Sequence, residues 1–309
     1  MSCFDANGYG FASQSARVRI RMDTGEMIDS KHSIQIPQTL KTVLSLPSVM
    51  DLAQQRIGMP LSDSIEAGAD LTFMPFWEHQ VQFMKEHLTD LKEIQATDLD
   101  GTTDFSIAEN PAKGARILNL CFASKEFRKI RMTYYDAGDK TQVFNSLWYP
   151  EETYNLPLLG IDLLKLAGGK KYLAVVDFQP IHTYEHEHAC LYEHLMKPIR
   201  QGYPSLQGHM SKRFYDENQF FSKEMLFARF EEAKIVDSDL MPAFCQYMDT
   251  YSGLVKSTSP ECNPSILDGH RAYDIYSASR DPAIHMFNTM FGQKWAESFV
   301  HEFLFDMSR

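Results

Sequence analysis

The chain has 309 residues, of which 44% are hydrophobic and 23% are charged, and its formal net charge is −11. This composition is typical of a globular protein that is long enough to bury a substantial core, and the negative charge argues against nucleic acid as the main partner. The five cysteines are widely spaced and form no C-x-x-C motif. We therefore expect a reducing compartment, and neither a zinc ribbon nor an iron–sulfur site.

Residues 1–70 are the least regular part of the chain, and we interpret them as an N-terminal extension of a main domain at 71–309. Within the extension, alternation at 16–22 suggests a short strand and a capping pattern predicts a helix at 48–57. The first residues do not resemble a secretory signal, whereas a plastid transit peptide stays open. No apolar run approaches the roughly 18 residues that indicate a membrane helix.

The main domain begins with an amphipathic pattern that predicts a helix over 73–96. Five strands bounded by turn signals follow, at 115–122, 127–135, 141–149, 156–166 and 171–178. The links between them are too short for crossover helices, which predicts an antiparallel meander. Helices are then expected at 184–199, 240–256, 264–280 and 282–305, with one further strand at 223–230. Strands followed by helices indicate the α+β class, with helices packed on a central sheet.

The strand predicted at 156–166 is apolar on both faces, yet it contains Asp162. A carboxylate there must be paired or must raise its pKa. If the link 150–155 closes a hairpin, Asn145 faces Gly160 and lies diagonally from Asp162, on one face. Glycine at this position leaves room for a flat molecule. The pattern predicts a ligand pocket with few polar groups, and the alternative is a buried aspartate satisfied by a backbone or arginine partner.

Other polar residues allow ordinary structural explanations. Asp281, before Pro282, is typical of a helix N-cap. His182 and His186 have a zinc-like spacing, but the H-E-x-x-H motif is absent, and we expect no metal site. A basic cluster of the kind that usually forms a solvated face comprises Lys125, Arg128, Lys129 and Arg131.

Several segments together resemble the ferredoxin-dependent bilin reductases. They are RKIRMTYY (128–135), QVFNSLWYP (142–150), LPLLGIDLL (156–164), VDFQP (176–180), FYDENQFFSK (214–223), YSASRDP (276–282) and FGQKWAESFVHEFLF (291–305). The resemblance runs in order from about residue 75 to the end of the chain, and no part of 1–70 shares it. It implies an α/β/α sandwich in which the bilin lies between the antiparallel sheet and the C-terminal helices.

Within the family, the segments are most similar to the members that reduce 15,16-dihydrobiliverdin to phycoerythrobilin. The branch that makes 15,16-dihydrobiliverdin from biliverdin is the first alternative, and a non-catalytic bilin carrier is the second. The resemblance implies sequential one-electron transfers from a reduced [2Fe-2S] ferredoxin through bilin radicals, with no cofactor bound to the protein. A preceding bilin reductase that hands over the substrate is a further expected partner, in the plastid stroma of an alga or the cytosol of a cyanobacterium.

The resemblance also assigns site residues. Asp162 and Asp281 match the family's proton donors, and Asn145 matches the position that orients the substrate. The bilin propionates need cations, for which Lys223, Arg229 and Arg280 are the candidates. Ferredoxin is acidic, so its docking requires basic residues on an acidic protein. The candidates for docking are Lys125, Arg128, Lys129, Lys197, Arg200, Lys212 and Arg213.

Overall fold

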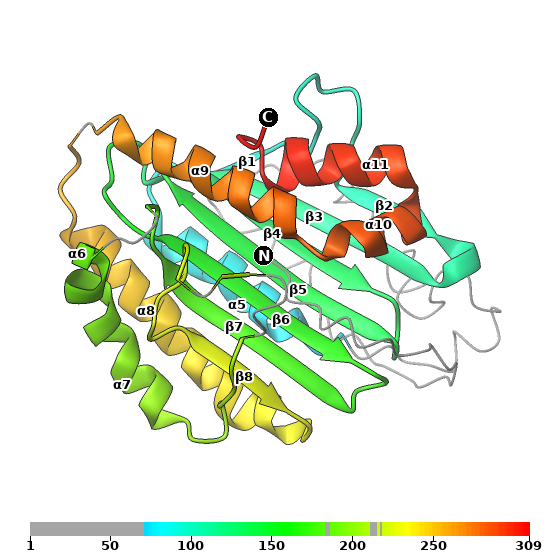
Figure 1. Ribbon diagram of the computed structural model, residues 1–309, viewed down its shortest axis with the longest axis horizontal. Helices are drawn as coiled ribbons and strands as arrows, with labels where there is room; N and C mark the ends of the chain where they lie inside the picture. Colours follow the sequence, from blue (N-terminus) through cyan, green and yellow to red (C-terminus); the bar gives the residue numbers. More distant parts are fainter. Residues whose placement is uncertain (1–70, 183–185, 211–214, 217, 262) are drawn as a thin grey trace.

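A computed structural model of the chain describes residues 71–182, 186–210, 215–216, 218–261 and 263–309. The extension, with the strand expected at 16–22 and the helix expected at 48–57, lies outside the described residues, as do Lys212 and Arg213. In the described part, one eight-stranded antiparallel sheet is covered by helices on both faces (Figure 1). The predicted α+β class and the sandwich are therefore confirmed.

The strands follow one another across the sheet in the order β1-β3-β4-β5-β6-β7-β8, and β2 pairs with β3 beside β1. Their bounds are β1 (Lys92–Ile94), β2 (Ile107–Asn110), β3 (Ala115–Ala123), β4 (Phe127–Asp136), β5 (Thr141–Pro150), β6 (Leu158–Leu166), β7 (Lys171–Gln179) and β8 (Leu226–Phe230). The five strands predicted in a row are β3 to β7, and their meander is confirmed because each pairs antiparallel with the next.

Two layers of helices enclose the sheet. On one face lie α5 (Met74–His87) and α8 (Met241–Ser257), with α7 (His194–Gly202) beside them. On the other face lie α9 (Ser265–Arg280), α10 (Ala283–Phe291) and α11 (Gln293–Ser298), which continues as a π-helix over Phe299–Leu304. In Figure 1, α9 to α11 are in front of the sheet and α5 and α8 are behind it.

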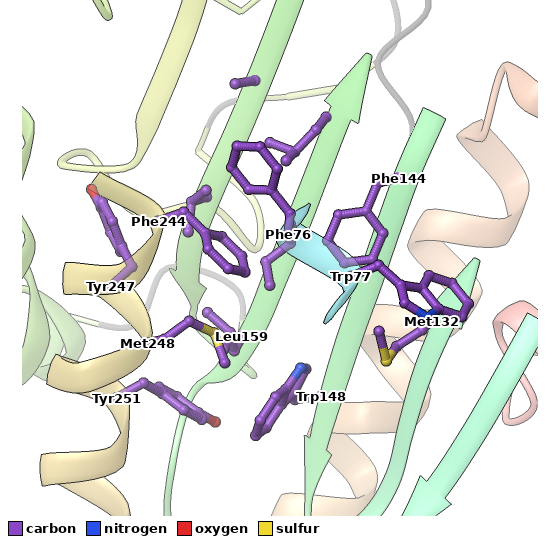
Figure 2. Packing of buried hydrophobic residues seen from close by; sticks show 14 of the residues in the cluster. Phe76, Trp77, Met132, Phe144, Trp148, Leu159, Phe244, Tyr247, Met248 and Tyr251 are labelled. Atoms are coloured by element: carbon purple, nitrogen blue, oxygen red, sulfur yellow. The ribbon is translucent and has the colours of Figure 1, made fainter. Parts of the chain in front are cut away.

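The face toward α5 and α8 is a nearly continuous apolar core, rich in aromatic rings. Phe244 of α8 packs edge-on against Phe76 of α5, with 5.2 Å between ring centroids. Trp148 of β5 and Tyr251 of α8 form a second T-shaped pair at 6.2 Å (Figure 2). We call this the apolar face of the sheet.

The helix predicted at 73–96 is wrong in its second half. It ends at His87, because Leu88 is extended and Asp90 has a left-handed φ of 53°. Residues 92–94 form the short strand β1, which the sequence analysis did not anticipate, and neither did it anticipate β2. The helix predicted at 282–305 is divided at Gly292, whose φ of 95° a helix cannot contain.

The predicted register between β5 and β6 is wrong by two residues. Asn145 pairs with Asp162, and Gly160 pairs with Leu147. The strand begins at Leu158 because Pro157 has no N–H to donate to the ladder. The residues between β5 and β6 instead make a turn in which the backbone N–H of Tyr154 donates to the carbonyl of Glu151. A shift of two residues keeps each side chain on its face, so the predicted grouping of Asn145 with Asp162 survives.

Candidate functional site

The sheet face under α9 to α11 carries a row of polar side chains, and we call it the polar face. Asn119 pairs with Thr133, Thr133 with Asn145, and Asn145 with Asp162, across four neighbouring strands. All four residues are buried. The Thr133 hydroxyl donates to Asn119 Oδ1 over 2.6 Å, and Asn119 Nδ2 donates to the Phe105 carbonyl over 2.6 Å. One end of the row is thus saturated within the protein.

The other end of the row holds the predicted pair. Asn145 Nδ2 donates to Asp162 Oδ1 over 3.1 Å, and the two residues are 6% and 2% exposed. The amide therefore orients one oxygen of a deeply buried carboxyl group. An arginine reaches Asp162 only through Asn145, because Arg131 Nη1 donates to Asn145 Oδ1 over 2.6 Å.

Arg131 is the principal residue that the sequence analysis misplaced. It is fully buried on β4, its Nε donates to the Leu304 carbonyl over 2.9 Å, and its guanidinium lies 5.3 Å from the ring centre of Phe305. The sequence grouped it with Lys125, Arg128 and Lys129 as a solvated basic cluster. The alternation of β4 could have revealed it, since both faces of a central strand are covered and its odd positions must be buried as well.

The expected room above Gly160 is filled in this structure by a neighbouring strand's side chain. A Cβ on Gly160 would lie 2.6 Å from Oε1 of Gln179, and that oxygen also accepts a hydrogen bond from the Tyr273 hydroxyl over 2.8 Å. The glycine thus permits close packing of Gln179 between β6 and α9. Its role in substrate binding stays a prediction.

Asp177 is a second buried carboxyl group on the polar face, and sequence reasoning did not select it. It is directly opposite Gly160 in the register and is fully buried. Burial raises its pKa to about 8, although the backbone N–H of Ser222 donates to Oδ2 over 3.0 Å. Oδ1 has no hydrogen-bond partner among the described residues. Burial therefore favours the protonated form of Asp177, which can donate a proton or a hydrogen bond.

Asp281 lies between α9 and α10, on the side of the sheet that these helices cover. It is 4% exposed, and its Oδ1 accepts a hydrogen bond from the backbone N–H of Ala283 over 2.8 Å. This is the capping contact that the Asp-Pro pattern predicts. The contact occupies Oδ1, and the role of Asp281 as a proton donor stays a prediction.

The three cations proposed for the bilin propionates are exposed. Lys223 follows Ser222, and its backbone N–H donates to Glu193 Oε1 over 2.8 Å. Arg229 lies on β8 with its guanidinium 5.4 Å from the ring centre of Phe227, and Arg280 ends α9 at 4.9 Å from that of Tyr276. Their predicted role stays a prediction.

The residues proposed for ferredoxin docking do not all lie on an open surface. Lys129 is 6% exposed and donates to the Phe303 carbonyl over 2.5 Å, and both it and Arg128 pair with Asp306. These two side chains anchor the end of the chain to β4. Lys125, in the turn between β3 and β4, is exposed, and on α7 Lys197 and Arg200 pair with Glu224.

In the part of the chain that the structure describes, no group of three or more His, Cys, Asp or Glu residues could hold a metal ion. Among the same residues, no helix combines the length and the apolar character needed to cross a bilayer. His188, which lies near the histidine pair with zinc-like spacing, has a contact within the protein: its Nε2 lies 2.7 Å from the Ser222 hydroxyl.

The raised pKa of Asp177 predicts how stability depends on pH. Between about pH 4 and pH 8 the Asp177 carboxyl group is deprotonated in the unfolded chain but protonated in the folded chain. The free energy of unfolding therefore falls as pH rises, by at most about 1.4 kcal/mol per pH unit. Asp177→Asn removes this contribution, and urea denaturation across this range should show a flatter profile. Asp237→Asn, at an exposed carboxyl group, is the control. Parallel profiles for Asp177→Asn and the wild type would contradict the assignment.

Known proteins match most of the chain. A model of the family "Ferredoxin-dependent bilin reductase" matches residues 82–306. Over 238 residues the chain is 39% identical to a 15,16-dihydrobiliverdin:ferredoxin oxidoreductase of Gloeobacter violaceus and 38% identical to one of Nostoc punctiforme. Each alignment covers 76% of this chain and 95% of the relative.

The fold also matches a solved structure, that of tomato phytochromobilin synthase in complex with biliverdin. The TM-score is 0.61 at 17% identity, over 76% of this chain and 83% of the other. The family match and the identity over three quarters of the chain agree with the motifs of the sequence. The chain therefore belongs to the ferredoxin-dependent bilin reductases, oxidoreductases that take their electrons from ferredoxin.

Proposed function

We propose that this chain reduces biliverdin to 15,16-dihydrobiliverdin by two electrons and two protons, with ferredoxin as the electron donor. The observation that carries the proposal is its identity to relatives named 15,16-dihydrobiliverdin:ferredoxin oxidoreductase along almost their whole length. A name of this form writes the electron donor before the acceptor. Reduced ferredoxin drives the same couple in the opposite direction, with 15,16-dihydrobiliverdin as the product.

This proposal departs from the step that the sequence motifs favoured. In the sequence analysis, the segments at 134–138, 158–162 and 214–223 favoured the members that reduce 15,16-dihydrobiliverdin to phycoerythrobilin, and this step is the second candidate. An enzyme of that kind receives its substrate from a preceding reductase. The two candidates differ in the bilin that the purified protein consumes.

The polar face supports an acid-assisted reduction. Ferredoxin delivers one electron at a time, so the bilin passes through a radical, and the protein must supply protons in step with the electrons. Asp162, oriented by Asn145, and Asp281, beside α10, are the proposed proton donors. Both carboxyl groups are buried on the side of the sheet that α9 to α11 cover, where general acids for a bound bilin would be needed.

The proposal is tested by anaerobic turnover with a ferredoxin-reducing system, in which biliverdin and 15,16-dihydrobiliverdin are supplied separately. We expect biliverdin to be converted and the reaction to stop at 15,16-dihydrobiliverdin, as identified by absorbance and chromatography. Conversion of 15,16-dihydrobiliverdin alone to phycoerythrobilin would establish the second candidate instead. Tight binding of a bilin without turnover would show a carrier.

Replacement of either proposed acid should separate binding from turnover. Asp162→Asn and Asp281→Asn keep the shape of the side chain but remove the acid, so we expect the bilin to bind while kcat falls on the order of 10²–10⁴-fold. The measurement is single-turnover kinetics with pre-reduced ferredoxin, together with a bilin titration. Asp237→Asn, on the surface, is the matched control. Full turnover in both variants would remove these residues from the mechanism.

Ferredoxin docking is proposed to use exposed basic residues, chiefly Lys125 and Lys197. The side chain of Lys197 is 54% exposed. We expect Lys125→Glu to raise the KM for ferredoxin several-fold at low salt, because charge attraction steers the encounter. The difference from wild type should shrink as salt increases, since exposed charges are screened. Lys234→Glu, at another exposed lysine, is the control, and a KM that is insensitive to both salt and Lys125 would refute this docking surface.

A further inference from the structure

Arg131 is a cation buried on the polar face, and among the described residues no carboxyl group contacts it directly. Its Nε and Nη1 donate to the neutral acceptors Leu304 O and Asn145 Oδ1, and its Nη2 has no hydrogen-bond partner among the described residues. No carboxylate in the described part of the chain forms an ion pair with it. A guanidinium remains charged at all ordinary pH values, and an unpaired buried charge is costly.

Arg116 is a second buried arginine, and it differs from Arg131 in having a carboxylate partner. Arg116 on β3 is 5% exposed, and its Nη2 and Nε both lie 3.2 Å from Oδ2 of Asp136. That charge is neutralised within the fold, on the apolar face. The guanidinium of Arg131, in contrast, has no carboxylate among its direct partners.

The position of Arg131 indicates what could balance it. Arg131 donates a hydrogen bond to Asn145, and the amide of Asn145 donates one to Asp162. Asn145 is thus the single residue between the cation and the proposed acid. In the register it pairs with Leu147, and Leu147 pairs with Gly160. Its field also reaches α9: burial raises the pKa of Tyr273 and Arg131 opposes that rise. The charge therefore acts on the space between the sheet and α9.

We propose that Arg131 stabilises the negative charge that the bilin acquires with its first electron, and that it positions Asn145 and Asp162 toward the same ligand. This inference rests on the proposed function. One electron passes from the reduced [2Fe-2S] cluster of ferredoxin to the bilin, which becomes a radical anion. A proton from an acid of the site then neutralises it, and a second electron and proton complete the reduction.

The physical reason is the low dielectric of a buried site. A fixed charge acts more strongly there than in water and needs no reorganisation when the electron arrives. A cation already paired with a carboxylate would have little net effect on an added electron. Because the direct partners of Arg131 are neutral, no contacting carboxylate cancels its effect on the reduction potential of the bound bilin.

The test compares Arg131→Gln and Arg131→Lys with the double variant Arg116→Gln/Asp136→Asn, which removes a buried arginine together with its partner on the apolar face. For Arg131→Gln we expect biliverdin binding, a lower midpoint potential of the bound bilin, and a first-electron rate reduced on the order of 100-fold in stopped-flow mixing with reduced ferredoxin. Arg131→Lys, which keeps the cation, should recover part of both. The double variant should retain the wild-type potential and rate.

An unchanged potential and first-electron rate in Arg131→Gln would overturn the proposal. Equal losses in the double variant would show that Arg131 acts only through the fold. The wild type provides a measurement that needs no variant: bound biliverdin must have a higher first-electron potential than free biliverdin, and an equal or lower value would also overturn the proposal. This potential can be measured with a chemical reductant, so it stands even if ferredoxin-driven turnover, and with it the proposed function, fails.

Discussion

The constraint on which the rest of the structure depends is a buried polar network between the sheet and the C-terminal helices. Arg131 joins the Leu304 carbonyl to Asn145, and Asn145 joins Asp162. Because a buried polar group that loses its partner destabilises the fold, the end of the chain cannot leave the sheet without a large loss of stability. The pairing of Arg128 and Lys129 with Asp306 adds to this connection. The polar face therefore determines where the C-terminal segment packs.

The two faces of the sheet have different physical roles. The apolar face packs rings from α5, α8 and the strands in edge-to-face pairs, and burial of this area stabilises the fold (Figure 2). That core offsets the cost of burying polar groups on the opposite face, including the carboxyl group of Asp177 and the guanidinium of Arg131.

The order of the elements could be predicted well because β3 to β7 are predominantly apolar runs bounded by turn residues. The errors occur where the chain geometry overrides the pattern. Pro157 delays the start of β6 and moves its register by two residues, and Gly292 divides a periodic apolar stretch into two helices. The short strands β1 and β2 carry no periodic signal of their own, since their pairing with β3 alone makes them strands.

From the sequence alone, alternation and the family motifs determined the antiparallel meander, the covered central strand, and the common face of Asn145 and Asp162. These follow from local rules, because side chains in a strand alternate between the two faces. Only the tertiary structure decided the state of the charged residues. It buried Arg131 and Lys129, which the sequence placed in a solvated cluster. It also filled the space at Gly160 with Gln179 and raised the pKa of Asp177 by burial. Burial and pairing depend on elements more than 100 residues away, such as the Leu304 carbonyl, and no local pattern contains that information.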